Sequence, residues 1–229
     1  MRAEVIAPET GAMLANTLTS RTSSTRWVVL VVMCAGYFLV LLDVTIVNVA
    51  LPAIASDLQI DVTDVQWVVD GYAIALACLL LAGGTIGDRH GHKRVVLCGL
   101  VTFGMASLAC GLAPGGGTLI GARVGQGAGA ALALPGTLAI ISRAFPGRGE
   151  QARAIGIWAG VGSMALPAGP VLGGALVQSL GWRAVFFINV PIVFVATLVV
   201  ARVVAESRDA WGRDWTGRAC CWVGACSRF

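Results

Sequence analysis

Two opposite charges, Asp43 and Arg123, lie inside long apolar stretches of this 229-residue sequence. A charge at the centre of a membrane helix costs roughly 2.5–3.5 kcal/mol or more, which marks such residues as functional candidates. Counted from the outer ends of their stretches, they lie at similar depths, about 10 Å and about 9 Å at ~1.5 Å per residue. An aspartate that is both desolvated and close to an arginine can exchange a proton as its surroundings change. The pattern predicts a proton-coupled pair; a static structural ion pair is the alternative.

Another carboxylate, Asp70, lies one turn into the next apolar stretch, beside Trp67 and Tyr72. It is either a functional group or a side chain that extends to the outer headgroup region, as polar side chains near helix ends do. The residues alone leave both interpretations open.

A short segment between the second and third apolar stretches combines glycines with charges. Glycine permits a close turn, and the charges could join that turn to a neighbouring element. A plain, positively charged connection is the alternative, which the density of glycine and the embedded acid disfavour. The candidate residues of this gating loop are Gly84, Gly87, Asp88, Arg89, Gly91 and Lys93.

The composition indicates that the solvent around these residues is a lipid bilayer. Hydrophobic residues make up 57% of the chain and charged residues 12%, against roughly 45–50% and 25% in soluble domains. A soluble domain needs a charged surface, which this composition does not supply. The mean hydropathy of +0.81 agrees.

The same counts disfavour several functional classes. The net charge is +4, but the basic residues fall in small groups between apolar stretches rather than in a nucleic-acid-binding cluster. The seven cysteines match no zinc or redox spacing. An intramembrane enzyme is not expected, because the only two histidines, His90 and His92, lie in the charged connection. We therefore expect no enzyme activity, no metal, no cofactor and no nucleic-acid partner.

Six apolar segments, each near the ~20 residues that a membrane-spanning helix needs, predict an all-α membrane protein with a six-helix bundle over 27–205. The segment 1–26 is expected to be a flexible cytoplasmic tail, and 206–229 a second cytoplasmic tail. The spans are expected at about 27–50, 65–87, 94–112, 118–141, 153–178 and 184–204.

Charges in the connections indicate the orientation of this bundle. Lys and Arg occur in 1–26, 88–94, 142–153 and from Arg202 onward, whereas 51–64 carries three Asp and neither Lys nor Arg. The positive-inside rule therefore predicts that both termini are cytoplasmic. The expected location is the cell (inner) membrane.

Glycines recur at helical spacing within two of the expected spans. Gly121, Gly125 and Gly129 share one face of the fourth, and Gly156 and Gly160 share one face of the fifth. In lipid, small residues at this spacing let helix backbones approach closely. We expect both helices to pack through these glycines.

The sequence resembles the major facilitator superfamily. The segment 84–93 resembles that family's signature loop, G-x-L-A-D-R-x-G-R-K, with Ile86 in place of Leu and His92 in place of Arg. Four further segments resemble, in the expected order, motifs of helices one, four, five and six in its drug:proton antiporter branch with fourteen spans: 42–52, 123–130, 169–174 and 181–191.

The resemblance implies a proton-coupled multidrug efflux transporter, an antiporter that exchanges protons for amphipathic small molecules. In such a protein Asp43 and Arg123 would form the proton-coupling site, and Asp88 would help to hold the outward-facing state. A proline removes one helical hydrogen bond, so a bend near it is physically expected. A bend and tight packing against leak would come from the helix-five motif, Gly169, Pro170, Gly173 and Gly174.

Transporters of this family have two six-helix halves around a central site, and this chain supplies the N-terminal half. The segment 214–217 resembles the start of a seventh span, but 218–229 is short, rich in cysteine and carries two arginines. Our hypothesis is a frameshift near Gly217 followed by an early stop. The alternatives are an inactive N-terminal fragment and a half-size protein that works as a homodimer.

Overall fold

The computed structural model describes residues 8–204, and for 8–24 the helical backbone alone. Within this range the chain is all-helical, with six helices long and apolar enough to cross a membrane, as the sequence predicts. The elements are α1 (Pro8–Leu58), α2 (Val62–His90), α3 (His92–Gly111), α4 (Gly116–Ala144), α5 (Arg148–Ser163), α6 (Ala165–Leu180), α7 (Arg183–Phe187) and α8 (Asn189–Val203). The expected C-terminal tail and the frameshift hypothesis fall on 206–229, outside the described residues.

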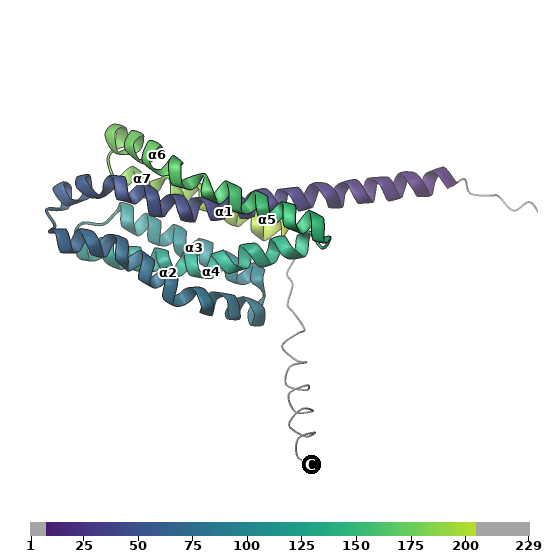
Figure 1. Ribbon diagram of the computed structural model, residues 1–229, viewed down its shortest axis with the longest axis horizontal. Helices are drawn as coiled ribbons and strands as arrows, with labels where there is room; N and C mark the ends of the chain where they lie inside the picture. Colours follow the sequence, from purple (N-terminus) through teal and green to yellow (C-terminus); the bar gives the residue numbers. More distant parts are fainter. Residues whose placement is uncertain (1–7, 205–229) are drawn as a thin grey trace, which may run out of the picture.

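The first helix is longer than its expected span at both ends. It begins at Pro8, inside the segment expected to be a tail, and it ends at Leu58. Proline suits a first helical position because its φ is already helical and its missing N–H is not needed there. The N-terminal part of α1 continues beyond the other helices (Figure 1).

Two of the six spans are interrupted, which the expected boundaries do not include. The fifth consists of α5 and α6, divided at Met164, and the sixth consists of α7 and α8, divided at Ile188. Pro167 and Pro191 follow four residues after the last residues of α5 and α7. A proline has no N–H to donate to the carbonyl four residues earlier, so each of these two prolines removes a helical hydrogen bond at an interruption.

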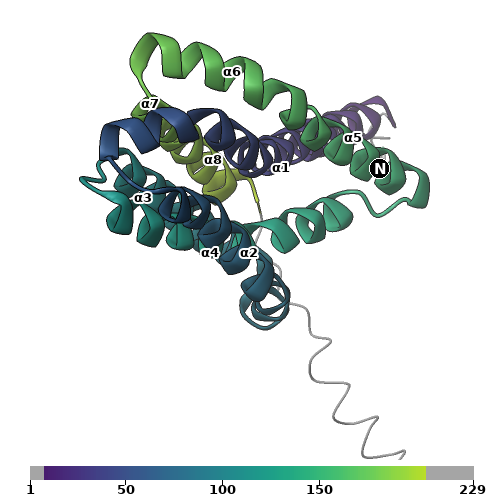
Figure 2. The same cartoon turned by 60° about the vertical axis from the view of Figure 1, so that its left-hand side comes forward.

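The helices form two groups that meet along α1 and α4. Helix α4 packs extensively against α2 and α3, whereas α1 packs against α6 and α8 packs against α3. Both views show α6 on the far side of α1 from α2 and α4 (Figures 1 and 2). Through this arrangement α1, α2, α3, α4 and α8 all reach the interior of the bundle.

Close approach of α4 to its neighbours depends on two glycines. A Cβ at Gly127 would overlap the carbonyl oxygen of Tyr72 on α2, and a Cβ at Gly129 would lie 2.5 Å from the backbone nitrogen of Phe103 on α3. Gly129 belongs to the predicted glycine face, but Gly121 of that face meets no atom within 4 Å among the described residues. The predicted face therefore makes a tight contact at Gly129 but not at Gly121, and Gly127 makes another tight contact from a different face of α4.

The predicted packing through Gly156 and Gly160 is wrong for the described part of the chain. A Cβ at either position would meet no heavy atom within 4 Å. The glycine of α5 that is tightly packed is Gly162, whose Cβ would overlap the ring of Tyr37 on α1. The spacing was helical, but it did not show which face of the helix turns towards α1.

Two apolar clusters make up the core. One includes Leu30, Met33 and Leu39 of α1, and the other begins at Leu42 and includes Ile46. Asp43 lies on α1 where the first cluster gives way to the second. The Asp43 carboxylate therefore has apolar packing on both sides along the helix axis.

Candidate functional site

Asp43 and Arg123 are in direct contact at the centre of the bundle. The Arg123 Nη1 donates to Asp43 Oδ2, and their side chains are 0% and 1% exposed. Asp43 comes from α1 and Arg123 from α4, which the sequence expected at similar depths. The structure thus brings together the two residues that the sequence singled out, across 80 positions of chain.

Gln126 links this pair to a third helix. It lies three residues after Arg123, on the same face of α4, and its Oε1 accepts from Arg123 Nη1 at 2.9 Å. Its Nε2 donates to Asp43 Oδ1 at 3.2 Å and to Ser107 Oγ of α3 at 2.7 Å. One amide therefore contacts both members of the ion pair and fixes their position relative to α3.

Asn189 supplies a further donor to Asp43. Its Nδ2 donates to Asp43 Oδ1 at 2.9 Å, and the residue is 1% exposed. Asn189 is the first residue of α8, directly after the interruption at Ile188. Asp43 Oδ1 thus accepts from Gln126 and Asn189, and Oδ2 accepts from Arg123.

Two residues of α2 also contact Arg123. Its Nε donates to the carbonyl oxygen of Val68 at 3.0 Å, and its guanidinium carbon lies 4.3 Å from the centre of the Tyr72 ring. Such a cation–π contact is stabilising when the cation is desolvated. Tyr72 in turn donates to the carbonyl of Val40 on α1 at 3.4 Å.

The charges of Asp43 and Arg123 depend on each other within this polar network. As an ion pair, Asp43 and Arg123 neutralise each other, and three donors satisfy the carboxylate. Protonation of Asp43 would leave the buried Arg123 charge uncompensated, which is strongly unfavourable. Loss of the Asp43 charge would therefore require rearrangement of Arg123 or of the helices around it.

Sequence reasoning assigned no role to Gln126, Asn189, Ser107 or Tyr72. The position of Gln126 three residues after Arg123 could have indicated its place, because the two share a helix face. Asn189 is a buried amide inside an apolar span, which is itself a functional signal. Nothing in the sequence could have shown that both amides meet the same carboxylate.

The predicted gating loop is more helical than expected. Helix α2 continues to His90 and α3 begins at His92, so Gly91 alone separates them. Gly91 has a φ of 98°, a left-handed conformation that favours glycine, and its N–H donates to the carbonyl of Gly87 at 2.9 Å. A Cβ at Gly87 would lie 2.6 Å from the His92 ring.

The other residues of this junction lie at the surface or contact neighbouring helices. Asp88 is 66% exposed and lies 3.2 Å from His92 Nε2, and Arg89 is exposed. Lys93 Nζ donates to the carbonyl of Ala201 at the end of α8, at 2.8 Å. Gly84 faces α4, where a Cβ on this glycine would lie 3.8 Å from the Cβ of Pro135. These residues form a group separate from the Asp43 network.

Half of the helix-five motif packs against α1. A Cβ at Gly169 would overlap Thr45, and one at Gly173 would lie 2.9 Å from Ile46. The Thr45 hydroxyl donates to the carbonyl of Ala165 at 3.2 Å, which joins α1 to the first turn of α6.

The other two motif residues do not make this contact. Pro170 is exposed, and Gly174 has no heavy atom within 4 Å of a Cβ position. The interruption of the span lies upstream, at Met164. Among residues 8–204, no group of three or more His, Cys, Asp and Glu side chains could hold a metal ion.

Comparison with known proteins identifies the family. The family model of the Major Facilitator Superfamily matches residues 33–217. The chain belongs to this superfamily. With six helices able to cross a membrane, it is a multi-pass membrane protein of a transporter family.

Curated relatives within the superfamily carry drug-resistance names. The chain is 42% identical over 185 residues to the methylenomycin A resistance protein of Bacillus subtilis (strain 168), covering 81% of this chain and 40% of that protein. It is 40% identical over 183 residues to the multidrug resistance protein Stp of Mycobacterium tuberculosis (strain CDC 1551 / Oshkosh), covering 80% and 34% respectively. The chain therefore spans less than half the length of these relatives.

A solved major facilitator fold confirms the architecture. The crystal structure of a peptide transporter in complex with sulfate aligns with a TM-score of 0.69 at 15% identity, covering 86% of this chain and 44% of that one. At this identity the likeness concerns the fold alone. The six helices correspond to the N-terminal half of a major facilitator fold, as the sequence predicts.

Proposed function

We propose that this chain is the N-terminal half of a proton-coupled exporter of amphipathic small molecules, an antiporter of the multidrug-resistance type. The observation that carries the proposal is the fully buried Asp43 carboxylate, which accepts from Arg123, Gln126 and Asn189. The names of the relatives support an efflux role. Membrane carboxylates in such networks are typical of proton relays.

In this proposal Asp43 is the proton carrier and Arg123 responds to its charge state. With Asp43 ionised, the pair draws α1 and α4 together. When Asp43 takes a proton, Arg123 loses its counter-ion, and the packing of α1, α4 and α8 around the site becomes less stable. Export then follows from coupling this change to the position of the substrate site between the two halves.

The junction between α2 and α3 has the role of a gate in this scheme. Gly84, Gly87 and Gly91 allow the close turn, whereas Asp88, Arg89 and Lys93 carry the charges. Lys93 reaches α8 in the described conformation. The exposed Asp88 and Arg89 remain able to contact a second half on the side that the distribution of Lys and Arg predicts to be cytoplasmic.

The helix-five motif has two roles. Gly169 and Gly173 seal α6 against α1, as their contacts support. Pro170 and Gly174 lie on the face that a second half would cover. The partners of the chain are then the proton, an amphipathic substrate, the bilayer of the cell membrane and a second six-helix unit, either a different half or, as a homodimer, another copy.

Transport in liposomes by the purified chain together with a second six-helix unit tests this proposal. With an imposed pH gradient, vesicles containing both should move a fluorescent amphipathic cation, and Asp43→Asn should abolish that movement. Asp64→Asn is the matched control, because Asp64 is an acidic residue in the first turn of α2, away from the network.

The controls separate the alternatives. Unchanged transport in Asp43→Asn would contradict proton coupling at this residue. If the chain alone is inactive but gains gradient-driven transport when a second half is supplied, the inactive-fragment alternative applies. If transport is found only with a fraction of the chain that has the mass of two copies, the homodimer alternative applies.

A further inference from the structure

A pocket of about 340 Å³ lies at one end of the bundle, between the region of α1 around Arg26 and the ends of α4 and α8. Apolar side chains from all three helices line it, including Val29, Ile140 and Val203. Two basic residues, Arg26 and Arg143, also contribute to the lining. The pocket thus combines a cationic rim with an apolar wall.

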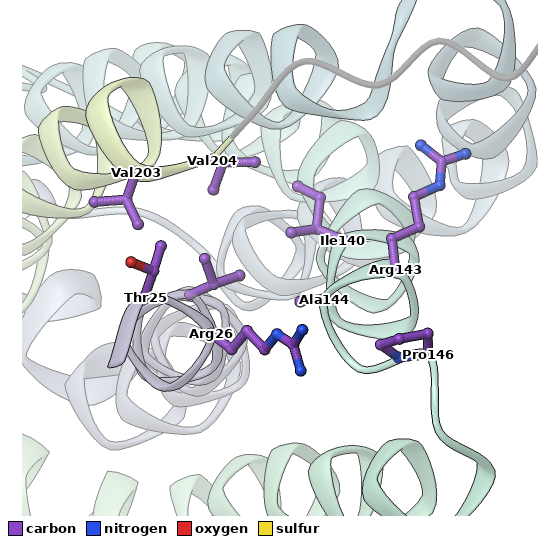
Figure 3. Close-up of a pocket in the computed structure, with 9 residues that line it drawn as sticks. Thr25, Arg26, Ile140, Arg143, Ala144, Pro146, Val203 and Val204 are labelled. Atoms are coloured by element: carbon purple, nitrogen blue, oxygen red, sulfur yellow. The ribbon is translucent and has the colours of Figure 1, made fainter. Parts of the chain in front are cut away.

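Figure 3 shows how these side chains lie. Arg26 extends from α1 towards Ala144 and Pro146 at the end of α4, while Val203 lies across the opening, at the end of α8. Arg143 projects from α4 with its guanidinium directed away from Arg26. Arg26 is therefore the cation that faces the space between α1 and α4.

The position of Arg26 along α1 places it at the level of lipid headgroups. It is the last polar residue before the apolar stretch that begins at Trp27. Trp27 is 44% exposed and packs edge-on against Phe145, with ring centres 5.8 Å apart. Tryptophan is enriched at the boundary between hydrocarbon and water, so the pocket mouth lies at that boundary.

A second, smaller pocket of about 110 Å³ lies on the other side of Arg26. It is lined by Arg26, Trp27, Phe145, Glu150 and Arg153. Arg26 is thus shared by two neighbouring cavities at the membrane surface. Three arginines and a single glutamate line these cavities together, so the local charge is positive.

We propose that the larger pocket binds an anionic phospholipid of the adjacent leaflet. The lipid phosphodiester pairs with Arg26, and an acyl chain lies along Val29, Ile140 and Val203. Guanidinium groups pair with phosphate in a bidentate geometry, and basic pockets between membrane helices bind acidic headgroups. This site is separate from the Asp43 network and does not depend on the proposed transport.

Binding of a defined lipid to the full chain tests the site. The delipidated chain in neutral detergent is titrated with a short-chain phosphatidylglycerol, and bound lipid is counted by native mass spectrometry. Arg26→Gln should weaken binding roughly 10- to 100-fold, as expected for loss of a hydrogen bond to a charged group. Arg26→Lys should retain part of the affinity because the charge remains.

Two further variants separate binding from folding. Arg148→Gln removes an exposed arginine outside the pocket and should leave the affinity unchanged. Val203→Trp fills the pocket without changing any charge and should also reduce lipid binding. Helical content by circular dichroism confirms that each variant is folded.

Three outcomes would overturn the proposal. If inorganic phosphate displaces the lipid at equal concentration, the site takes a free anion rather than a lipid. If phosphatidylcholine of the same chain length binds equally well, the pocket is an apolar groove without headgroup selection. If folded Arg26→Gln and Val203→Trp both bind like the parent chain, the lipid binds elsewhere.

Discussion

At the scale of residues, the central feature is a single carboxylate held by three donors from two helices. Arg123 and Gln126 of α4 contact different oxygens of Asp43, and Asn189 of α8 shares one of them with Gln126. A buried ion pair of this kind adds little net stability, because desolvation offsets much of the attraction. Removing one partner alone is the costly change.

The ion pair can be measured by a double-mutant cycle. Arg123→Leu leaves Asp43 as an unpaired buried charge and should lower the free energy of unfolding by about 3–5 kcal/mol. Asp43→Asn combined with Arg123→Leu removes both charges and should cost less than the sum of the single changes. Unfolding in detergent, followed by circular dichroism, gives the three values. Strictly additive losses would show that the two residues are not coupled.

The donor from α8 gives a second test at this scale. Asn189→Leu removes one hydrogen bond to Asp43 and should lower the free energy of unfolding by about 1–3 kcal/mol, the range for a buried group that loses its partner. Asn48→Leu is the matched control, since Asn48 is exposed on α1 and should tolerate the change. Thermal unfolding compares the two. Equal stability of both variants would argue against a role for Asn189 in holding Asp43.

At the scale of elements, apolar length and charge distribution predicted the six spans, because those properties are local. The interruptions at Met164 and Ile188 were missed, although each lies three residues before a proline. Proline alone does not decide them, since Pro52 and Pro135 lie inside continuous helices. Whether a helix continues through a proline or is interrupted near it depends on how the helix packs, which the sequence does not show.

The sequence predicted only part of the candidate site, because it shows the local environment of a residue but not the packing of the helices. Asp43 and Arg123 stand out because charges are rare in apolar spans, and their similar depth followed from counting residues. Gln126 and Asn189 are neutral, and they become informative only when α4 and α8 are placed next to α1. Their identification needed the tertiary arrangement.

The packing of α4 gives a prediction at the scale of elements. Gly127→Ala places a methyl group against the backbone of α2, where no flexible side chain can give way. Such overpacking should lower the free energy of unfolding by about 1–3 kcal/mol. Gly160→Ala has open space and should be neutral or slightly stabilising, since alanine favours helix. Denaturation midpoints in detergent compare the two; a similar loss in both variants would contradict the proposed contact.

At the scale of the whole molecule, burial is uneven among the helices. The apolar windows of α1 and α4 are each 56% buried, whereas those of α2 and of the α5–α6 span are 22% and 17% buried. The site therefore lies in the well-packed part of the half, and the uncovered faces belong to α2 and α5–α6. These are the faces available to lipid or to a second six-helix unit.

A charge on α2 bears on the assembly state. Asp70 on α2 is half-buried and lies two residues past Val68, so it is at the depth of the Arg123 contact. A symmetric pair joined along α2 would bring two carboxylates together in hydrocarbon, which is unfavourable. We expect the purified chain to have the mass of one copy by light scattering in detergent. A stable mass of two copies would favour the homodimer alternative.

The spacing of the network along the chain has a consequence for how the protein is made. Asp43 precedes Arg123 by 80 residues and Asn189 by 146. During synthesis α1 must enter the bilayer long before its counter-charge on α4 exists. Until α4 is made, Asp43 lacks its counter-charge, and its final donor, Asn189, arrives only with α8. The network is therefore complete only with the sixth span, and incorrect insertion of α8 would leave Asp43 without the hydrogen bond from Asn189.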